Sequence, residues 1–145
     1  RSAPLHDIGK VAIPDHILLK RGPLTDAEWV TMRTHAREGR DALEQAERDL
    51  GAPAEFLTYA KEIAAHHHER WDGAGYPDGL AGEAIPLSAR LMALADVFDA
   101  LTTRRCYKPA MSPEDARALI AADRGRQFDP DVVDAFLASF GAFRE

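Results

Sequence analysis

Three consecutive histidines precede a glycine-rich segment near the middle of the chain. His66, His67 and His68 are followed by Glu69, and the letters DGAGYP occupy positions 72–77. Neutral imidazoles and carboxylates are ligands that suit iron, manganese and zinc in proteins. The chain has a single cysteine, which argues against a structural zinc site built from a cysteine cluster. The segment therefore indicates chemistry at a metal site.

Other candidate ligands are spread along the sequence. They are the adjacent pair His6 and Asp7, then His35 and Asp96. A carboxylate can bridge two metals, whereas an imidazole nitrogen ordinarily binds one, so Asp7 among several imidazoles favours a multinuclear site. Each residue alone also has a structural explanation, because a lone helical histidine is often a packing or surface residue and an aspartate often caps a helix or faces solvent. The joint pattern carries the inference.

Helical patterns must position these groups. The capping box that runs from Thr25 to Glu28 predicts a helix that continues to about Leu50, with only Gly39 interrupting it. His35 lies beside its expected buried stripe, which consists of Trp29, Met32, Ala36, Gly39 and Leu43. Gly9, close to the first histidine pair, is expected to end a helix that begins before Arg1.

A second helical pattern leads into the histidine run. From Ala54 the apolar stripe is expected at Phe56, Ala60, Ile63 and Ala64. The next position on this face is His67, and His68 lies about 100° further round the helix. Both imidazoles can therefore converge on one inward-facing site. The segment 71–86 that follows is rich in glycine and proline and predicts a long ordered loop.

The remainder of the chain is also helical by pattern. A helix beginning near Pro86 and Ser88 carries Asp96 and Asp99 one turn apart and is expected to bury Leu91, Leu94, Ala95, Phe98 and Leu101. Two further helices are expected to begin at Ser112 and Asp129, each a capping residue followed by proline. The last helix buries some combination of Val132, Val133, Phe136, Leu137 and Phe140. No segment alternates like a strand, which predicts an all-α fold.

Composition limits the classes of function. The 145 residues predict one domain over 1–145, and the net charge of −6 excludes a basic field that would hold duplex nucleic acid. No apolar run is long enough to cross a membrane within this segment, and the use of a single cysteine favours the cytoplasm. Because the chain begins at Arg1 without methionine, we expect it to be a piece of a longer signalling protein.

Several motifs together resemble the HD-GYP domain, a branch of the HD phosphohydrolases. They are the HDIGK segment at 6–10, His67-His68-Glu69, the DGAGYP segment at 72–77, and the segments 79–87, 95–102 and 105–108. The resemblance implies an HD-domain helical bundle, here without its N-terminal helix or helices, with two or three divalent metals, iron or manganese. It also implies hydrolysis of the bacterial second messenger cyclic di-GMP to linear pGpG and on to GMP.

The same resemblance assigns roles to residues by position. His6, Asp7, His35, His67, His68 and Asp96 match the metal ligands, with Asp7 bridging. Lys10 matches a cation beside the metals, and Tyr76, Arg105 and Lys108 match positions that hold substrate guanine and phosphate. Glu69 and Asp99 are expected outside the ligand set, Glu69 orienting a ligand imidazole through its other nitrogen. Cys106 replaces a proline that is common in the family.

A second function of a different class remains open. The domain could bind cyclic di-GMP, or a partner such as a GGDEF-type cyclase, through the GYP loop without catalysis. A third is hydrolysis of another nucleotide or phosphoester. A binding module has no need for all six ligands, which favours the enzyme. The sequence leaves open the metal, the end product, the input domain, the oligomeric state and any ligand that precedes Arg1.

Overall fold

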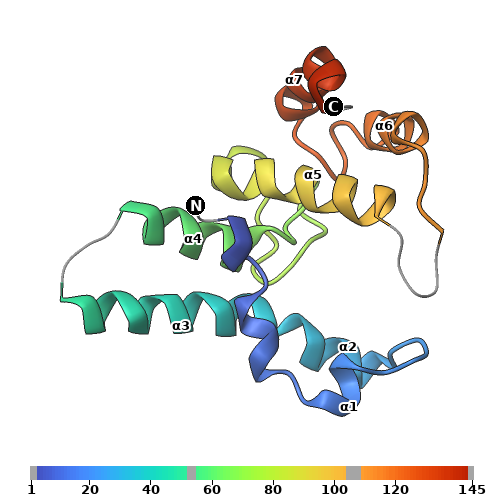
Figure 1. Cartoon of the computed structure of the whole chain (residues 1–145). Coiled ribbons are helices and arrows are strands. Elements are labelled where there is room, and N and C mark those ends of the chain that lie inside the picture. Colours follow the sequence, from blue (N-terminus) through green and yellow to red (C-terminus); the bar gives the residue numbers. More distant parts are fainter. Residues whose placement is uncertain (1–2, 52–54, 104–108, 144–145) are drawn as a thin grey trace.

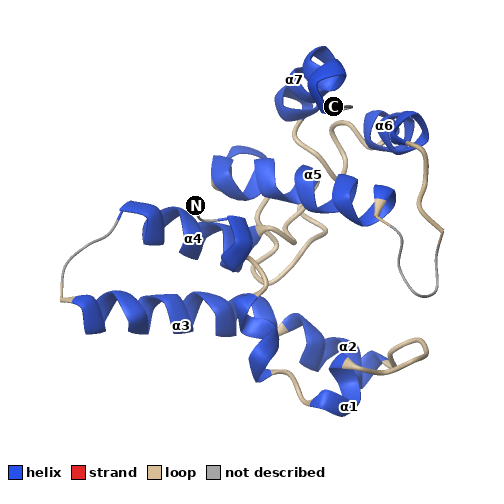
Figure 2. Cartoon of the chain, in the orientation of Figure 1, coloured by secondary structure: helices blue, strands red, loops and turns tan. Residues whose placement is uncertain are grey.

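The computed structural model describes residues 3–51, 55–103 and 109–143, and their regular structure is helical throughout (Figures 1 and 2). The α-helices are α1 (Asp15–Leu18), α2 (Asp26–Arg33), α3 (His35–Leu50), α4 (Glu55–His66), α5 (Leu87–Thr102), α6 (Pro113–Ala122) and α7 (Pro130–Ser139). Short 3₁₀ helices are η1 (Ala3–Leu5), η2 (Ile8–Ala12), η3 (Gly82–Ala84) and η4 (Phe140–Phe143). The described residues include no strand, which confirms the all-α prediction. Residues 104–108, with Arg105, Cys106 and Lys108, lie outside the described part.

The first half of the chain packs around the hairpin of α3 and α4, which lie side by side in Figure 1. Their buried contacts come from Leu43, Leu57, Ala60 and Ala64, with Leu5 and Ile8 of the N-terminal segment packed against them. Gly9 lies in η2, and a methyl group on it would clash with the carbonyl oxygen of His35. The prediction that Gly9 ends a preceding helix is therefore wrong, because its role is to let η2 approach α3.

The helix expected from Thr25 to Leu50 is broken at Thr34. The capping box of Thr25 and Glu28 is confirmed, but the Thr34 hydroxyl donates to the carbonyl of Thr31 at 2.8 Å, and α3 begins anew at His35. A hydroxyl bonded back to its own helix competes with the helical ladder and bends the chain. Trp29, expected in the core, is 45% exposed, and α2 contributes no buried residue.

The stripe of α4 is rotated by one residue at its start. Phe56, predicted to be buried, is 46% exposed, and Leu57 takes its place in the core. From there the stripe follows the predicted positions, with Ala60 and Ile63 buried and His67 continuing the same face. The error arises because residues at the start of α4 lie at the edge of the hairpin, where the sequence pattern does not show which neighbour covers them.

The second half of the chain forms a separate core between α5, α6 and α7. Its buried members are Leu94, Ile120, Phe128, Val132, Val133, Phe136 and Phe140, and Phe98 packs against them. Ser112 and Asp129 cap α6 and α7 as predicted. Leu91 and Ala95, predicted to be buried, instead line the open hollow of about 370 Å³ between α5 and α7. Helix α5 also packs against α4 and so joins the two halves. No helix among the described residues is long and apolar enough to cross a membrane.

Candidate metal centre

Four separate elements bring six candidate ligands together. His6 and Asp7 immediately precede η2, and His35 is the first residue of α3. His67 and His68 directly follow the last residue of α4, and Asp96 lies in the middle of α5. The ligand atoms form two neighbouring groups, and within each group all the ligand atoms lie within 4.8 Å of one another. One group consists of Asp7, His35, His67 and His68. The other consists of His6, His67 and Asp96. Each group could hold a metal ion.

The two oxygens of Asp7 face different sides of this centre. Its Oδ1 lies 3.6 Å from His35 Nε2 and 3.8 Å from His67 Nε2. Its Oδ2 lies 3.3 Å from His6 Nε2 and accepts a hydrogen bond from Lys10 Nζ at 2.6 Å. His6 Nε2 is in turn 3.7 Å from Asp96 Oδ1. A carboxylate placed between two groups of ligands can serve both, as the sequence suggested.

Backbone carbonyls fix the tautomers of two imidazoles. Nδ1 of His35 lies 2.7 Å from the carbonyl oxygen of Met32, and Nδ1 of His67 lies 2.8 Å from that of Ile63. A carbonyl oxygen only accepts, so each Nδ1 carries a hydrogen and each neutral ring presents a bare Nε2 lone pair. His68 Nε2 lies 3.1 Å from His35 Nε2, which requires either one shared proton or a cation between them.

Two buried atoms of the centre have no hydrogen-bond partner among the described residues. They are Asp7 Oδ1 and His67 Nε2, which face each other across 3.8 Å and both carry lone pairs. Buried polar atoms normally have a partner, and two acceptors cannot satisfy one another. A divalent cation would satisfy both, and the imidazole and carboxylate donor set suits iron, manganese or zinc. The residues present therefore fit a metal.

The charge states also suit metal binding. Burial lowers the pKa of His67 to about 4 and that of His68 to about 3, so both imidazoles are neutral at pH 7. Burial by itself raises the pKa of Asp7, but hydrogen bonds from His6 and Lys10 outweigh it and hold the pKa well below its usual value. The nearby His6 imidazole, whose Nε2 lies 3.7 Å from Asp96 Oδ1, lowers the pKa of Asp96. Ionised carboxylates and neutral imidazoles are the forms that bind metals.

The GYP loop folds back onto the end of α4. Gly75 lies so close that a methyl group on it would come within 2.5 Å of the Arg70 nitrogen, and the Tyr76 amide donates to the carbonyl of His68 at 3.3 Å. The Tyr76 ring stacks on His68 with 4.8 Å between centroids, and the Arg33 guanidinium lies over the same ring at 5.1 Å. Burial raises the pKa of Tyr76 to about 12, so its hydroxyl keeps its proton. That hydroxyl, rather than a ring face, is therefore the part suited to meet a ligand.

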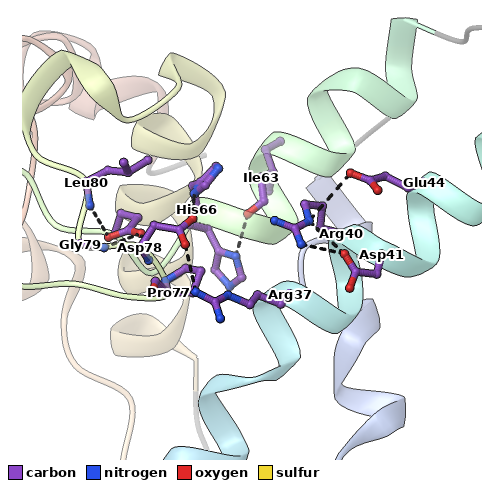
Figure 3. Close-up of polar contacts among 12 residues, drawn as sticks. Arg37, Arg40, Asp41, Glu44, Ile63, His66, Pro77, Asp78, Gly79 and Leu80 are labelled. Carbon is purple, nitrogen blue, oxygen red and sulfur yellow. Dashed lines mark hydrogen bonds and ion pairs between the residues drawn. The ribbon is translucent and has the colours of Figure 1, made fainter.

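Glu69 holds this loop by its backbone. It is 3% exposed, and its carboxylate accepts hydrogen bonds from the backbone nitrogens of Asp78, Gly79 and Leu80 at 2.7, 3.1 and 3.1 Å. The sequence predicted that Glu69 would orient a ligand imidazole, whereas the Nδ1 atoms of His35 and His67 contact the backbone carbonyls of Met32 and Ile63. Figure 3 shows the loop at this point and Arg37, which pairs with Asp78 at 3.1 Å and donates to the Pro77 carbonyl at 3.3 Å.

The remaining sequence candidates lie elsewhere. Asp99 is exposed, accepts a hydrogen bond from the Thr103 hydroxyl at 3.2 Å, and is not a member of either ligand group. Arg105 and Lys108 lie outside the described residues. Arg33 was missed by the sequence analysis. Its position two residues before His35 is a weak sequence signal, and only the folded loop brings it to Tyr76.

Comparisons with known proteins agree with this geometry. The HD domain family matches residues 1–132. The chain is 62% identical over 138 residues to a cyclic di-GMP phosphodiesterase of Vibrio cholerae, covering 95% of this chain and 28% of that protein. It is 46% identical over 142 residues to the 3'3'-cGAMP-specific phosphodiesterase 2 of the same organism, covering 98% of this chain and 26% of that protein.

A solved structure shows the same fold. The crystal structure of a cyclic GMP-AMP specific phosphodiesterase of Vibrio cholerae matches with a TM-score of 0.61 at 23% identity, over 97% of this chain and 37% of that one. The chain thus spans between about a quarter and two fifths of the length of the proteins it matches. With the ligand groups, the GYP loop and the family match in agreement, the chain belongs to the HD domain family and is of the HD-GYP type.

Proposed function

We propose that this domain is a metal-dependent phosphodiesterase that hydrolyses cyclic di-GMP to linear pGpG and GMP. The observation that carries the proposal is the pair of unpartnered buried acceptors, Asp7 Oδ1 and His67 Nε2, inside a group of four ligand atoms. Burying such acceptors costs free energy that a bound cation recovers. The name of the relative at 62% identity supports cyclic di-GMP as the substrate.

His6, Asp7, His35, His67, His68 and Asp96 would hold the metals, which we propose are two ions of iron or manganese. The number follows from Asp7, whose oxygens face two different ligand groups. A third ion would need further ligands. Divalent ions at such a site lower the pKa of bound water and offset charge that develops on a phosphate.

The other residues would position the substrate. The Lys10 ammonium holds Asp7 Oδ2 and lies at the edge of the centre, where it can also donate to a phosphate oxygen. Tyr76 carries its protonated hydroxyl next to His68 and can donate to the same group. For Arg105 and Lys108 we retain the phosphate- and guanine-binding roles that the family resemblance implies. In the cell we propose a cytoplasmic signalling protein with additional input domains.

The experiment is hydrolysis of cyclic di-GMP by protein loaded with iron or manganese without oxygen, with bound metal counted and products separated by chromatography. The matched pair of variants is Asp7→Asn at the centre and Asp41→Asn, whose carboxylate is exposed on α3. Loss of even an outer supporting group at a metal site costs about 10- to 100-fold, so Asp7→Asn should reduce turnover by at least about 100-fold. Asp41→Asn should match the parent.

Competing outcomes separate the alternatives. Faster cleavage of 3'3'-cGAMP than of cyclic di-GMP would mean that the preferred substrate is 3'3'-cGAMP, as the name of the relative at 46% identity indicates for that protein. If fully metallated protein turned over neither dinucleotide, the proposal that this domain is a phosphodiesterase would be refuted. Binding of cyclic di-GMP or of a GGDEF-type cyclase that survives Asp7→Asn but is lost on Tyr76→Ala would then support the binding module.

A further inference from the structure

A recess lies beside Tyr76. Helix α2, the start of α3 and the GYP loop border an open hollow of about 330 Å³, lined by Val30, Arg33, Thr34, Arg37, Tyr76 and Pro77. Tyr76 belongs both to this hollow and to the metal centre, because its ring stacks on His68. A ligand that reaches past Tyr76 would therefore span the two.

The hollow contains two arginines with different surroundings. Arg37 is committed to the loop, since it pairs with Asp78 at 3.1 Å and donates to the Pro77 carbonyl. Arg33 lies over the Tyr76 ring at 5.1 Å, and no carboxylate of the described residues lies within ion-pair distance of it. A guanidinium lying over a ring still has its N–H edge available for an anion, and two parallel donors suit a phosphate.

The walls of the hollow are mostly apolar. Val30 is largely exposed on α2, and Pro77 faces the same space from the loop. Val30 is free to contact a ligand because α2 ends at the break at Thr34 before it joins the core. Helix α2 therefore contributes no buried residue. An arginine beside an aromatic ring, an aliphatic side chain and a proline resembles the mixture of one charged anchor and apolar walls that small-molecule sites use.

A cyclic dinucleotide substrate needs a cation outside the metal centre. A cyclic dinucleotide carries two phosphodiesters, joined to each other through both nucleosides, and when one phosphodiester lies at the metals the other must lie further out. In a chain with net charge −6, this second anion needs a local cation. Building on the proposed function, we propose that Arg33 binds the unreacted phosphodiester of the cyclic dinucleotide and that the hollow beside Tyr76 receives one of its two nucleosides.

The test compares substrates with one and two phosphodiesters. Arg33→Ala, Arg33→Lys and the control Arg48→Ala would be assayed on cyclic di-GMP and on bis(p-nitrophenyl) phosphate, which has a single phosphodiester. Arg48 is an exposed arginine of α3 whose side chain bonds only to Gln45 among the described residues. Because an interaction made equally in ground and transition states changes KM alone, Arg33→Ala should raise KM for cyclic di-GMP about 10- to 100-fold with kcat unchanged.

The single-phosphate substrate should be cleaved by Arg33→Ala as by the parent. Arg33→Lys should recover part of the KM, since it keeps the charge but loses the paired donors. An unchanged KM for cyclic di-GMP, or an equal loss on both substrates, would overturn the proposal, the latter because Arg33 would then act through Tyr76 on the metal centre.

A binding measurement distinguishes failure of the proposed catalytic function from failure of the Arg33 site. If the metal-loaded parent cleaves neither compound, the equilibrium Kd for cyclic di-GMP would be measured for the parent and for Arg33→Ala. Weaker binding by about tenfold or more in the variant would support the Arg33 site in a non-catalytic domain. Equal binding by both, or no binding by the parent, would overturn it.

Discussion

At the scale of single residues, the metal centre depends on where protons sit. The backbone carbonyls of Met32 and Ile63 hold the Nδ1 hydrogens of His35 and His67, which leaves both Nε2 atoms bare beside Asp7. This device uses no additional charged side chain. It commits the imidazoles to the neutral form before any metal arrives, because protonating a buried Nε2 that faces other imidazoles is unfavourable.

This commitment makes the stability of the metal-free protein depend on pH. The pKa values of His67 and His68 in the folded chain are about 4 and about 3, below the ordinary 6.5, so the unfolded chain binds more protons between these values. The free energy of unfolding should therefore fall as the pH falls from about 6.5 towards 4. Each histidine contributes at most about 1.4 kcal/mol per pH unit to the slope.

Urea unfolding of chelator-treated protein between about pH 4.5 and 7.5 would measure this slope. His67→Gln should reduce it, because one of the two histidines that bind protons on unfolding is removed. His16→Gln, at an exposed position of α1, should keep the parent's slope. A slope that is the same in His67→Gln and the parent would contradict the assignment.

At the scale of elements, the junction between α4 and the GYP loop determines the site. Helix α4 delivers His67 and His68 at its end, and the loop returns to place Tyr76 on His68. Glu69 fixes that return by accepting three backbone hydrogen bonds, and Arg37 ties the loop to α3. These contacts fix the position of a loop that has no regular secondary structure.

Glu69→Gln should loosen the loop, because an amide offers one acceptor oxygen where the carboxylate offers two. At least one backbone N–H of the loop would lose its partner and face an amide donor. We expect a loss of about 2–4 kcal/mol in the free energy of unfolding and faster amide hydrogen exchange over 76–80. Glu44→Gln is the control, since its carboxylate pairs with Arg40 at 3.8 Å on the exposed side of α3 (Figure 3). Equal exchange in the two variants would show that Glu69 does not hold the loop.

At the scale of the whole molecule, the chain has two cores joined by α5. The ligand atoms come from the first half, apart from Asp96, while the aromatic cluster of Phe98, Phe136 and Phe140 lies in the second. The site and the second core should therefore contribute independently to stability, as separated groups generally do.

Phe136→Ala should lower the free energy of unfolding by about 3–5 kcal/mol through the cavity it leaves. The gain from metal should stay the same in this variant, about 2.7 kcal/mol at a metal concentration 100 times Kd. Asp7→Asn should show the reverse, losing the gain from metal. Thermal or urea unfolding with and without manganese would measure both. A gain that shrinks in Phe136→Ala would mean that α5 transmits strain to Asp96.

Much of this molecule follows from local sequence. The capping box of α2, the Ser-Pro start of α6 and the Asp-Pro start of α7 determine where these helices begin, because the cap bonds lie within four residues. The stripe of α4 leads to His67 because helical periodicity is local. The six candidate ligands could also be named from the sequence. Their residue types are unusual together, and their motifs resemble those of a known domain.

Tertiary structure decided what depends on neighbours distant in the chain. Whether Phe56 or Leu57 is buried depends on which side of α4 meets α3, and the role of Gly9 depends on its approach to His35. The three partners of Glu69 lie nine to eleven residues away across a loop, and Arg33 meets Tyr76 only once that loop has folded. Side-chain periodicity specifies a face but not what covers it, so these contacts were settled by packing alone.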